Sequence, residues 1–200
     1  MTERAAASRR CVLGLLASPL VCSAFPRATA APASPAASAI APPPEVLHEL
    51  PAARLFGSGR LRRFLFHVYD ARLWTGPGFD VARWSIEPLA LELEYGRTLN
   101  GPLIAERSIE EMRRGAEISP AQQGSWLAAM QRAFPDVHEG DRMTGVQLPG
   151  VATRIFVNGR LTGEIRDAEF TRLFFGIWLA PHTSEPRLRA ALLAGAPGGS

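Results

Sequence analysis

The sequence predicts an α+β domain in which an open antiparallel β-sheet carries helices packed on one face. Three observations support this fold class. Segments typical of strands come first, two amphipathic helices follow, and a strand meander with two further helices completes the order. Residues 88–97 alternate between apolar and polar side chains, which is typical of a half-buried strand. Asn158-Gly159, between two more strand-like runs, is a strong signal for a two-residue hairpin.

The first part of the sheet is expected from two runs. Residues 60–74 are rich in aromatic and branched side chains and lack Pro and Gly, so they predict one long strand, preceded by Gly57 and Gly59. Residues 88–97 predict the next strand. Its buried face should carry Leu89, Leu91, Leu93, Tyr95 and Arg97. A Tyr and an Arg therefore end the face that points to the core.

Two helices should follow this strand. Residues 102–114 predict the first, which Gly115 ends. The second begins at Ser119, where Pro in the first turn and Gln122 at the capping-box position complete a start signal. Its apolar stripe runs to Phe134.

The remaining elements return to strands and then to helices. Strands are expected at 142–148, 152–157 and 160–165. Asp167 should cap a third helix that extends through Leu179, and Ser184 should cap a short fourth one. The folded domain is thus expected over residues 45–195.

The N-terminus predicts a signal peptide over residues 1–30. Basic residues precede an apolar run from 11 to 25, and Ala28-Thr29-Ala30 is a small-x-small cleavage site, so cleavage is expected before about Ala31. The run is too short to span a bilayer, which needs roughly 20 apolar residues. Arg9-Arg10 is compatible with a twin-arginine signal or with an ordinary secretory one. Residues 31–44, rich in Pro and Ala, predict a disordered linker. We therefore expect a periplasmic or secreted protein with no stable membrane anchor.

Composition narrows the chemistry that remains after cleavage. Removing residues 1–30 takes four of the 22 basic residues and one of the 19 acidic ones, so the rest is formally neutral and offers no basic footprint for a nucleic-acid partner. Both cysteines leave with the signal, and the chain has no Lys, which excludes thiol and Schiff-base chemistry. The four widely spaced histidines predict no metal site, and no cofactor is expected. The oligomeric state stays open.

The order of elements and three local strings resemble the chalcone isomerase-like family, in its bacterial exported branch. The strings are Gly57-x-Gly59-Arg60 leading into Phe66-His67-Val68-Tyr69-Asp70-Ala71-x-Leu73-Trp74, then Phe134-Pro135-Asp136-Val137-x-Glu139-Gly140-Asp141, and Val157-Asn158-Gly159-Arg160-Leu161-x-Gly163-x-Ile165. The resemblance runs from about Leu55 to Leu193. It implies an open antiparallel sheet with helices over one face and a ligand cleft between them.

The resemblance also implies two kinds of activity, because plant enzymes of the family close a flavanone ring without a cofactor and other members bind fatty acids through an Arg and a Tyr. The enzymes' strand Thr falls on Tyr69, their Tyr before the first helix near Asn100, and their Asn within that helix near Arg107. Only the Ser or Thr of the penultimate helix is retained, as Thr171. The family Arg matches either Arg60 or Arg62. Because three positions depart, ring closure is not expected.

A small hydrophobic or amphipathic ligand fits these side chains better. The expected binding set is Tyr69, Tyr95, Arg97, Asn100 and Arg107. Arg grips a carboxylate through two donors and a Tyr hydroxyl adds a neutral one. Most of these residues also have a structural interpretation, since Arg97 can reach solvent, Arg107 can pair with Glu111 four residues on, and the two tyrosines can belong to the core. Thr171 can likewise bond back within its own helix.

Three hypotheses follow from the sequence. The preferred one is a cofactor-free periplasmic binder of a fatty acid or similar amphipathic carboxylate, with Arg97 or Arg107 on the head group. The second is an isomerase, an intramolecular lyase, in which Arg60 or Arg62, with Tyr69 and Thr171, polarises the carbonyl of an enone or phenolic substrate. The third is a structural partner in an envelope complex.

Overall fold

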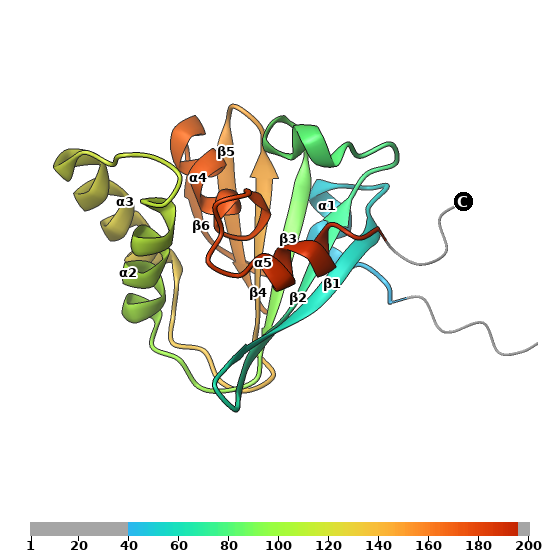
Figure 1. Ribbon diagram of the computed structural model, residues 1–200, viewed down its shortest axis with the longest axis horizontal. Helices are drawn as coiled ribbons and strands as arrows, with labels where there is room; N and C mark the ends of the chain where they lie inside the picture. The colour runs from blue at the N-terminus through green and yellow to red at the C-terminus, as the bar shows by residue number, and fades with distance from the viewer. Residues whose placement is uncertain (1–39, 196–200) are drawn as a thin grey trace, which may run out of the picture. The chain divides into compact units, whose positions relative to one another are not determined.

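A computed structural model describes residues 40–195, which fold into a six-stranded sheet with helices (Figure 1). The strands are β1 (Arg54–Arg63), β2 (Phe66–Thr75), β3 (Leu89–Tyr95), β4 (Arg142–Leu148), β5 (Ala152–Val157) and β6 (Arg160–Ile165). The helices are α1 (Pro44–Glu49), α2 (Gly101–Met112), α3 (Pro120–Ala133), α4 (Ala168–Leu179), α5 (Pro186–Leu192) and the short 3-10 helix η1 (Val81–Ile86). The expected signal peptide and most of the expected linker lie outside the described residues. Of the linker, residues 40–43 have no helix or strand, and Pro44 already begins α1.

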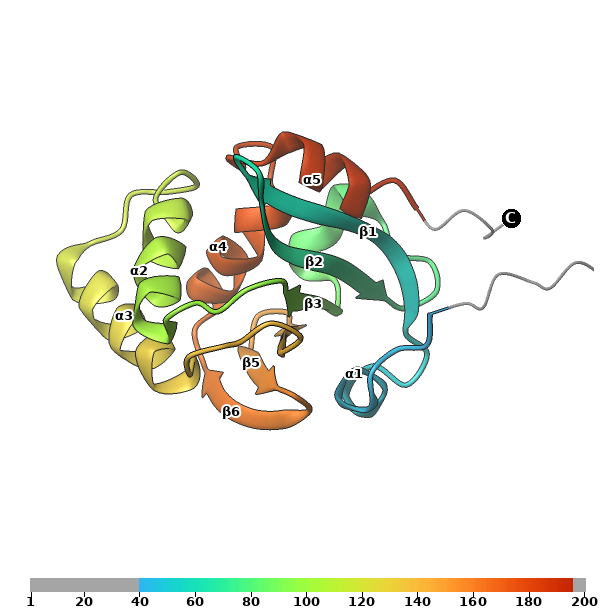
Figure 2. The same ribbon diagram turned by 90° about the horizontal axis from the view of Figure 1, so that it is seen from below.

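The sheet confirms the predicted fold class. Its six strands lie in sequence order, and each pairs antiparallel with its neighbours. Figure 2 shows α4 and α5 on one side of the curved sheet, with α2 and α3 beyond α4. The short helix α1 lies on the opposite side, where it contacts β4. The sequence did not predict this second covering element.

The prediction of one long strand over residues 60–74 was wrong, because the chain turns back at Phe64 and Leu65 to form the β1–β2 hairpin. Phe64 adopts the left-handed conformation with φ 55°, which is rare for a residue with a bulky side chain. The run has no Gly, Pro, Asn or Asp at the turn. Because the residue types that usually indicate a turn are absent there, this apolar turn could not be predicted from the sequence.

Gly57 and Gly59 were expected to precede the first strand, but they lie within β1. A Cβ atom at Gly57 would come 2.2 Å from the carbonyl oxygen of Leu192, and one at Gly59 would come 2.8 Å from Leu188 Cδ1. The two glycines are needed because α5 packs directly on the backbone of β1.

The helix signals were mostly confirmed. Ser119 and Gln122 form the predicted capping box of α3, and the Asp167 carboxylate accepts the first N–H groups of α4. The hairpin at Asn158-Gly159 is also present, with both residues at positive φ. Ser184 does not cap the last helix, which begins at Pro186 after a turn held by other groups.

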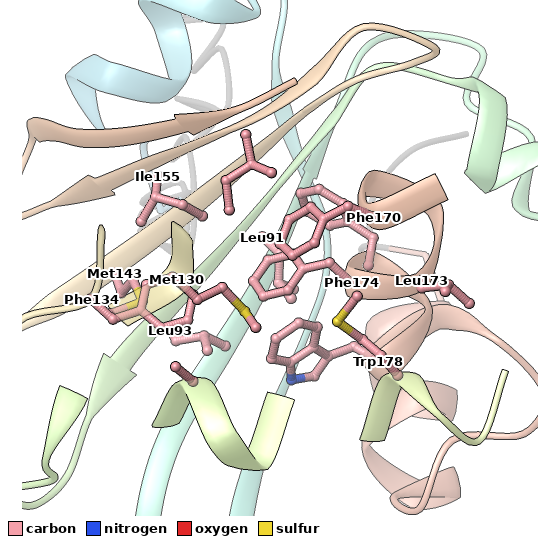
Figure 3. Close-up of a cluster of buried hydrophobic side chains, with 14 of the residues drawn as sticks. Leu91, Leu93, Met130, Phe134, Met143, Ile155, Phe170, Leu173, Phe174 and Trp178 are labelled. Atoms are coloured by element: carbon pink, nitrogen blue, oxygen red, sulfur yellow. The ribbon is translucent and has the colours of Figure 1, made fainter. Parts of the chain in front are cut away.

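The two faces of the sheet have different cores. The face under α2, α3, α4 and α5 carries the larger apolar cluster, shown in part in Figure 3. The face toward α1 carries a smaller one, made of Val46, Ala53, Trp74, Ala90, Val146 and Phe156. Beside this small cluster lies Glu92, which is only 2% exposed. Its carboxylate accepts hydrogen bonds from Trp74 Nε1 at 2.8 Å and from Arg72 Nη1 at 3.0 Å.

Candidate ligand-binding site

A cavity of about 450 Å³ lies between the sheet and the helices. Its volume falls within the range of small-molecule sites, about 300–1000 Å³. The walls are mainly apolar and come from strands β1 to β5 and from helices α2 and α4. A cavity with this lining suits a ligand that is mostly hydrocarbon.

The sheet contributes the floor of the cavity through the alternation of β3. Leu91, Leu93 and Tyr95 point to the helices, and Gly145 of β4 lies directly opposite Leu91. A Cβ atom at Gly145 would come 3.4 Å from the Phe175 ring. The missing side chain at Gly145 therefore keeps part of the cavity open.

Helix α4 contributes the facing wall through a row of aromatic rings. Phe170 and Phe174 stack with their centroids 5.4 Å apart, and Phe174 meets Trp178 edge-to-face at 5.5 Å (Figure 3). Such contacts hold the rings in fixed orientations. Phe174, Phe175 and Trp178 reach the cavity.

An irregularity in the β1–β2 hairpin brings two successive residues of β2 to the cavity. Leu61 pairs with Tyr69 but Arg62 pairs with His67, so Val68 is an extra residue without a partner. A bulge of this kind redirects side chains that would otherwise alternate. Both Val68 and Tyr69 consequently line the cavity.

The hydroxyl of Tyr69 is oriented by Trp178, whose indole N–H donates to it at 3.0 Å. Because Trp can only donate, the hydroxyl proton of Tyr69 is left for another acceptor. Among the described residues, the hydroxyl of buried Tyr95 has only the sulfur of Met143 as acceptor, at 3.9 Å. Burial raises the pKa of both tyrosines, so both hydroxyls are neutral donors at physiological pH.

Charged groups gather at the edge of the cavity near Tyr69. Arg63, from the end of β1, faces Glu185 at 3.8 Å, beyond hydrogen-bond distance. Arg107 of α2 donates to Glu110 at 2.9 Å and also to Glu111. Glu111 is buried, and its Oε2 has no hydrogen-bond partner among the described residues. Arg63 is therefore the less engaged of the two cations.

Four of the residues predicted for the site line the cavity. Tyr69, Tyr95, Asn100 and Arg107 are among its walls. The structural interpretations hold as well for three of them. Tyr95 belongs to the larger apolar cluster, Tyr69 packs against it, and Arg107 makes the predicted pair with Glu111. The Asn100 side chain caps α2 and donates to Asp136.

The other four predicted residues lie outside the cavity lining. Arg60 and Arg62 point to the far side of β1, where Arg60 holds Asp70 through two hydrogen bonds of 2.5 and 2.9 Å. The guanidinium of Arg97 lies over the Phe66 ring, 5.3 Å from its centroid. Thr171 is buried, and its hydroxyl accepts a hydrogen bond from the Thr153 hydroxyl at 2.9 Å. The Thr171 hydroxyl in turn donates to the carbonyl of Asp167, four residues earlier.

Six polar residues of the cavity lining were not predicted from the sequence, namely Arg63, Ser108, Glu111, Trp178, Ser184 and Glu185. Arg63 shares a face with Leu61 by strand alternation, and a correctly placed turn would have revealed it. Trp178 stood out only as an apolar residue, although its N–H needs a partner when buried. Nothing local in the sequence singles out the two glutamates.

Residues 40–195 contain no group of three His, Cys, Asp or Glu side chains placed to hold a metal ion. None of the helices described is both long enough and apolar enough to cross a membrane.

Comparisons with known proteins agree with this architecture. The sequence model of the chalcone isomerase-like family matches residues 52–194. An uncharacterised protein of Haemophilus influenzae is 30% identical over 128 residues, and the match spans 64% of this chain and 61% of that protein's length. The crystal structure of a fatty-acid binding protein of Arabidopsis thaliana superposes with a TM-score of 0.55 at 11% identity, covering 71% of this chain and 87% of the plant chain. This last likeness shows a shared fold.

Proposed function

The chain belongs to the chalcone isomerase-like family, and on this premise we propose that it is a periplasmic, cofactor-free binder of a fatty acid or similar amphipathic carboxylate, without ring-closing activity. One observation carries the proposal. A cavity of about 450 Å³ with mainly apolar walls has neutral and cationic donors, from Tyr69 and Arg63, beside one another. The fatty-acid binding protein of Arabidopsis thaliana, which shares the fold, supports this ligand class.

The carboxylate of the ligand would be held by Arg63 and Tyr69. Arg63 makes only a long contact to Glu185, so it can turn to a carboxylate without losing a hydrogen bond to that residue. The Tyr69 hydroxyl already accepts from Trp178 and can donate to the ligand. Arg107 is a second contact and is less available because two glutamates engage it.

The hydrocarbon tail of the ligand would lie between β3 and the aromatic row of α4. Each buried methylene contributes about 0.8 kcal/mol, from which the cost of ordering the chain is subtracted. Affinity should therefore rise with chain length until the cavity is full. A plateau among saturated fatty acids would report the usable length of the cavity.

The predicted catalytic residues do not meet at one place in the structure. Arg60 and Arg62 lie on the far side of β1, and Thr171 is bonded to Thr153 away from the cavity. Of that set only Tyr69 lines the cavity. This separation supports the absence of ring closure in the proposal.

Native mass spectrometry of the purified protein, followed by titration with saturated fatty acids, tests the proposal. We expect a copurified or added fatty acid at one per chain, and at least fivefold weaker binding in Arg63→Gln and Tyr69→Phe. Arg62→Gln, the neighbouring position on the opposite face of β1, is the matched control and should bind normally. A cavity that stays empty and refuses fatty acids would overturn the proposal, as would turnover of chalcones above the solution rate.

The proposed location rests on the N-terminal sequence and has its own test. Fractionation should find the protein in the periplasm. Replacing Arg9 and Arg10 by Lys should abolish export if the signal is of the twin-arginine type. Unchanged export of that variant would indicate the ordinary secretory route, and a cytoplasmic wild type would contradict the location.

A further inference from the structure

The turn of the β1–β2 hairpin exposes the largest continuous run of apolar side chains in the described residues. Phe64 and Leu65 are 96% and 95% exposed, and Phe66 beside them is mostly exposed as well. Figure 1 shows this turn, in dark teal, at the extreme end of the long hairpin. Single exposed apolar residues are common, but a contiguous group on a projecting turn is typical of an interaction site.

Arginines surround this apolar turn. Arg62 and Arg63 precede it on β1, and Arg97 places its guanidinium 5.3 Å from the centre of the Phe66 ring. Arg60 lies a little farther along β1, where Asp70 neutralises it. The turn therefore combines exposed aromatic and aliphatic groups with cationic ones, the combination found where proteins sit at the surface of anionic membranes.

The same hairpin forms part of the cavity wall. Leu61, Arg63, Val68 and Tyr69 all line the cavity, and they lie within a few residues of the turn on both strands. A partner that binds the hairpin turn would consequently lie next to the polar edge of the cavity. A ligand leaving a lipid layer at this point would have a short path to the binding site.

We propose that the hairpin turn, residues 62–67, docks on the surface of a lipid bilayer that contains anionic lipids. Phe64 and Leu65 insert among the acyl chains near the headgroups, while Arg62 and Arg97 contact lipid phosphates. Two long apolar side chains and two arginines give reversible attachment.

A protein partner is a poorer fit to this turn. Stable protein interfaces bury about 800 Å² on each side, whereas the apolar part of the turn is three side chains at the end of a two-stranded ribbon. A bilayer needs no matching surface, because the acyl chains adapt to the inserted side chains. Size and charge together favour the lipid surface.

Flotation of the full chain with vesicles of phosphatidylglycerol and phosphatidylcholine tests the docking. Phe64→Ser/Leu65→Ser should lower partitioning at least tenfold, because two large apolar groups no longer leave water. The control Ile86→Ser/Val151→Ser removes apolar groups that are 60% and 56% exposed at the opposite end of the sheet, and it should float like wild type. The segment before residue 40 is the same in every variant, so it contributes equally.

A second experiment measures whether the turn itself enters the bilayer. An environment-sensitive fluorophore is attached at Leu65→Cys, or at Val151→Cys for comparison, in a Cys11→Ser/Cys22→Ser background. With anionic vesicles, the emission of the probe at 65 should shift to the blue, and the probe at 151 should not respond. Pure phosphatidylcholine vesicles should give a clearly smaller shift, since the arginines have no anionic lipid to bind.

Several results would overturn the docking. These are equal flotation of the two double variants, no shift at position 65, or a shift that depends on protein concentration without vesicles, which would indicate a second copy of the chain as the partner. The inference is independent of the proposed ligand, because vesicle binding should persist in Tyr69→Phe. Loss of fatty-acid binding and loss of membrane docking are thus separately visible.

Discussion

The two faces of the sheet are built from alternate residues of the same strands, yet they are stabilised in different ways. The face under α2, α4 and α5 is apolar and encloses a cavity. The face under α1 has a small apolar cluster surrounded by ion pairs, with Glu92 held by Trp74 and Arg72, and Arg154 held by Glu49 and Glu164. One face keeps unfilled space, and the other carries nearly buried carboxylates, of which Glu92 has both oxygens hydrogen-bonded.

This difference indicates how the fold tolerates a cavity. Empty volume costs stability because the atoms that line it lose packing contacts. The opposite face ties α1, β2, β3 and β5 together through charged side chains that include nearly buried carboxylates. We infer that the charged face holds the sheet in shape while the cavity face stays open for a ligand. Four predictions test this division of roles between the two faces.

Leu73 and Leu91 provide a matched pair on the cavity side. They lie directly opposite each other on β2 and β3 and are equally buried, but only Leu91 lines the cavity. Leu73→Ala should cost about 4 kcal/mol of unfolding free energy and Leu91→Ala about 2 kcal/mol, since the second side chain has fewer packed neighbours to lose. Urea denaturation measures both, and equal losses would show that the cavity is well packed around Leu91.

Glu92 and Glu94 provide the corresponding pair on the charged side. Glu92→Ala leaves the Trp74 N–H buried without its acceptor and should cost about 3 kcal/mol. Glu94 is partly exposed and bonds only to Arg72 among the residues described, so Glu94→Ala should cost less than about 1 kcal/mol. Fatty-acid binding to the folded protein should be unchanged in both variants. A loss of binding in Glu92→Ala would mean that the two faces are coupled.

Trp178 and Thr171 distinguish a positioning role from a structural one on α4. Trp178→Phe removes the hydrogen bond that orients Tyr69 and should weaken fatty-acid binding about fivefold. Thr171→Val loses the bond to Thr153, so it should lower stability by about 1 kcal/mol and leave the affinity alone. The two effects are read by titration and by thermal melting. The reverse pattern would place Thr171 in the binding machinery.

Acid should act on the charged face first. The hydrogen bond from Arg60 lowers the pKa of Asp70, and that from Arg154 lowers the pKa of Glu164. A carboxylate whose folded pKa lies below its unfolded value stabilises the fold fully above about pH 4, and this contribution disappears as the pH falls through the folded pKa. The melting temperature should therefore decline below about pH 4. Glu164→Gln should flatten this decline, which thermal melting at several pH values would measure.

Most of the fold could be predicted from the sequence, because its signals are local. The capping box at Ser119, the cap at Asp167 and the hairpin at Asn158-Gly159 all depend on residues within a few positions of one another. The alternation of residues 88–97 identified the cavity floor for the same reason. The β1–β2 turn failed because Phe64 adopts a backbone conformation that its side chain disfavours.

The candidate site was only half predictable, because its polar groups depend on contacts that are distant in sequence. Tyr69 and Tyr95 could be found from strand alternation and from the family resemblance. Arg63 could not be found in this way, because residues 60–74 were predicted to form one continuous strand and the turn directly after Arg63 was not recognised. The pairing of Trp178 with Tyr69 joins residues 109 positions apart, and no local pattern encodes such a contact.

The unpaired Val68 in the β1–β2 hairpin has a consequence for how related proteins can vary. β1 is an edge strand, and its hairpin ends in solvent, so residues gained or lost there do not disturb the pairing of the inner strands. A single insertion in this ribbon changes which side chains border the cavity and where the apolar turn lies. The hairpin is therefore the segment in which relatives can acquire new ligand preferences, and new sites of attachment, while they keep the rest of the domain.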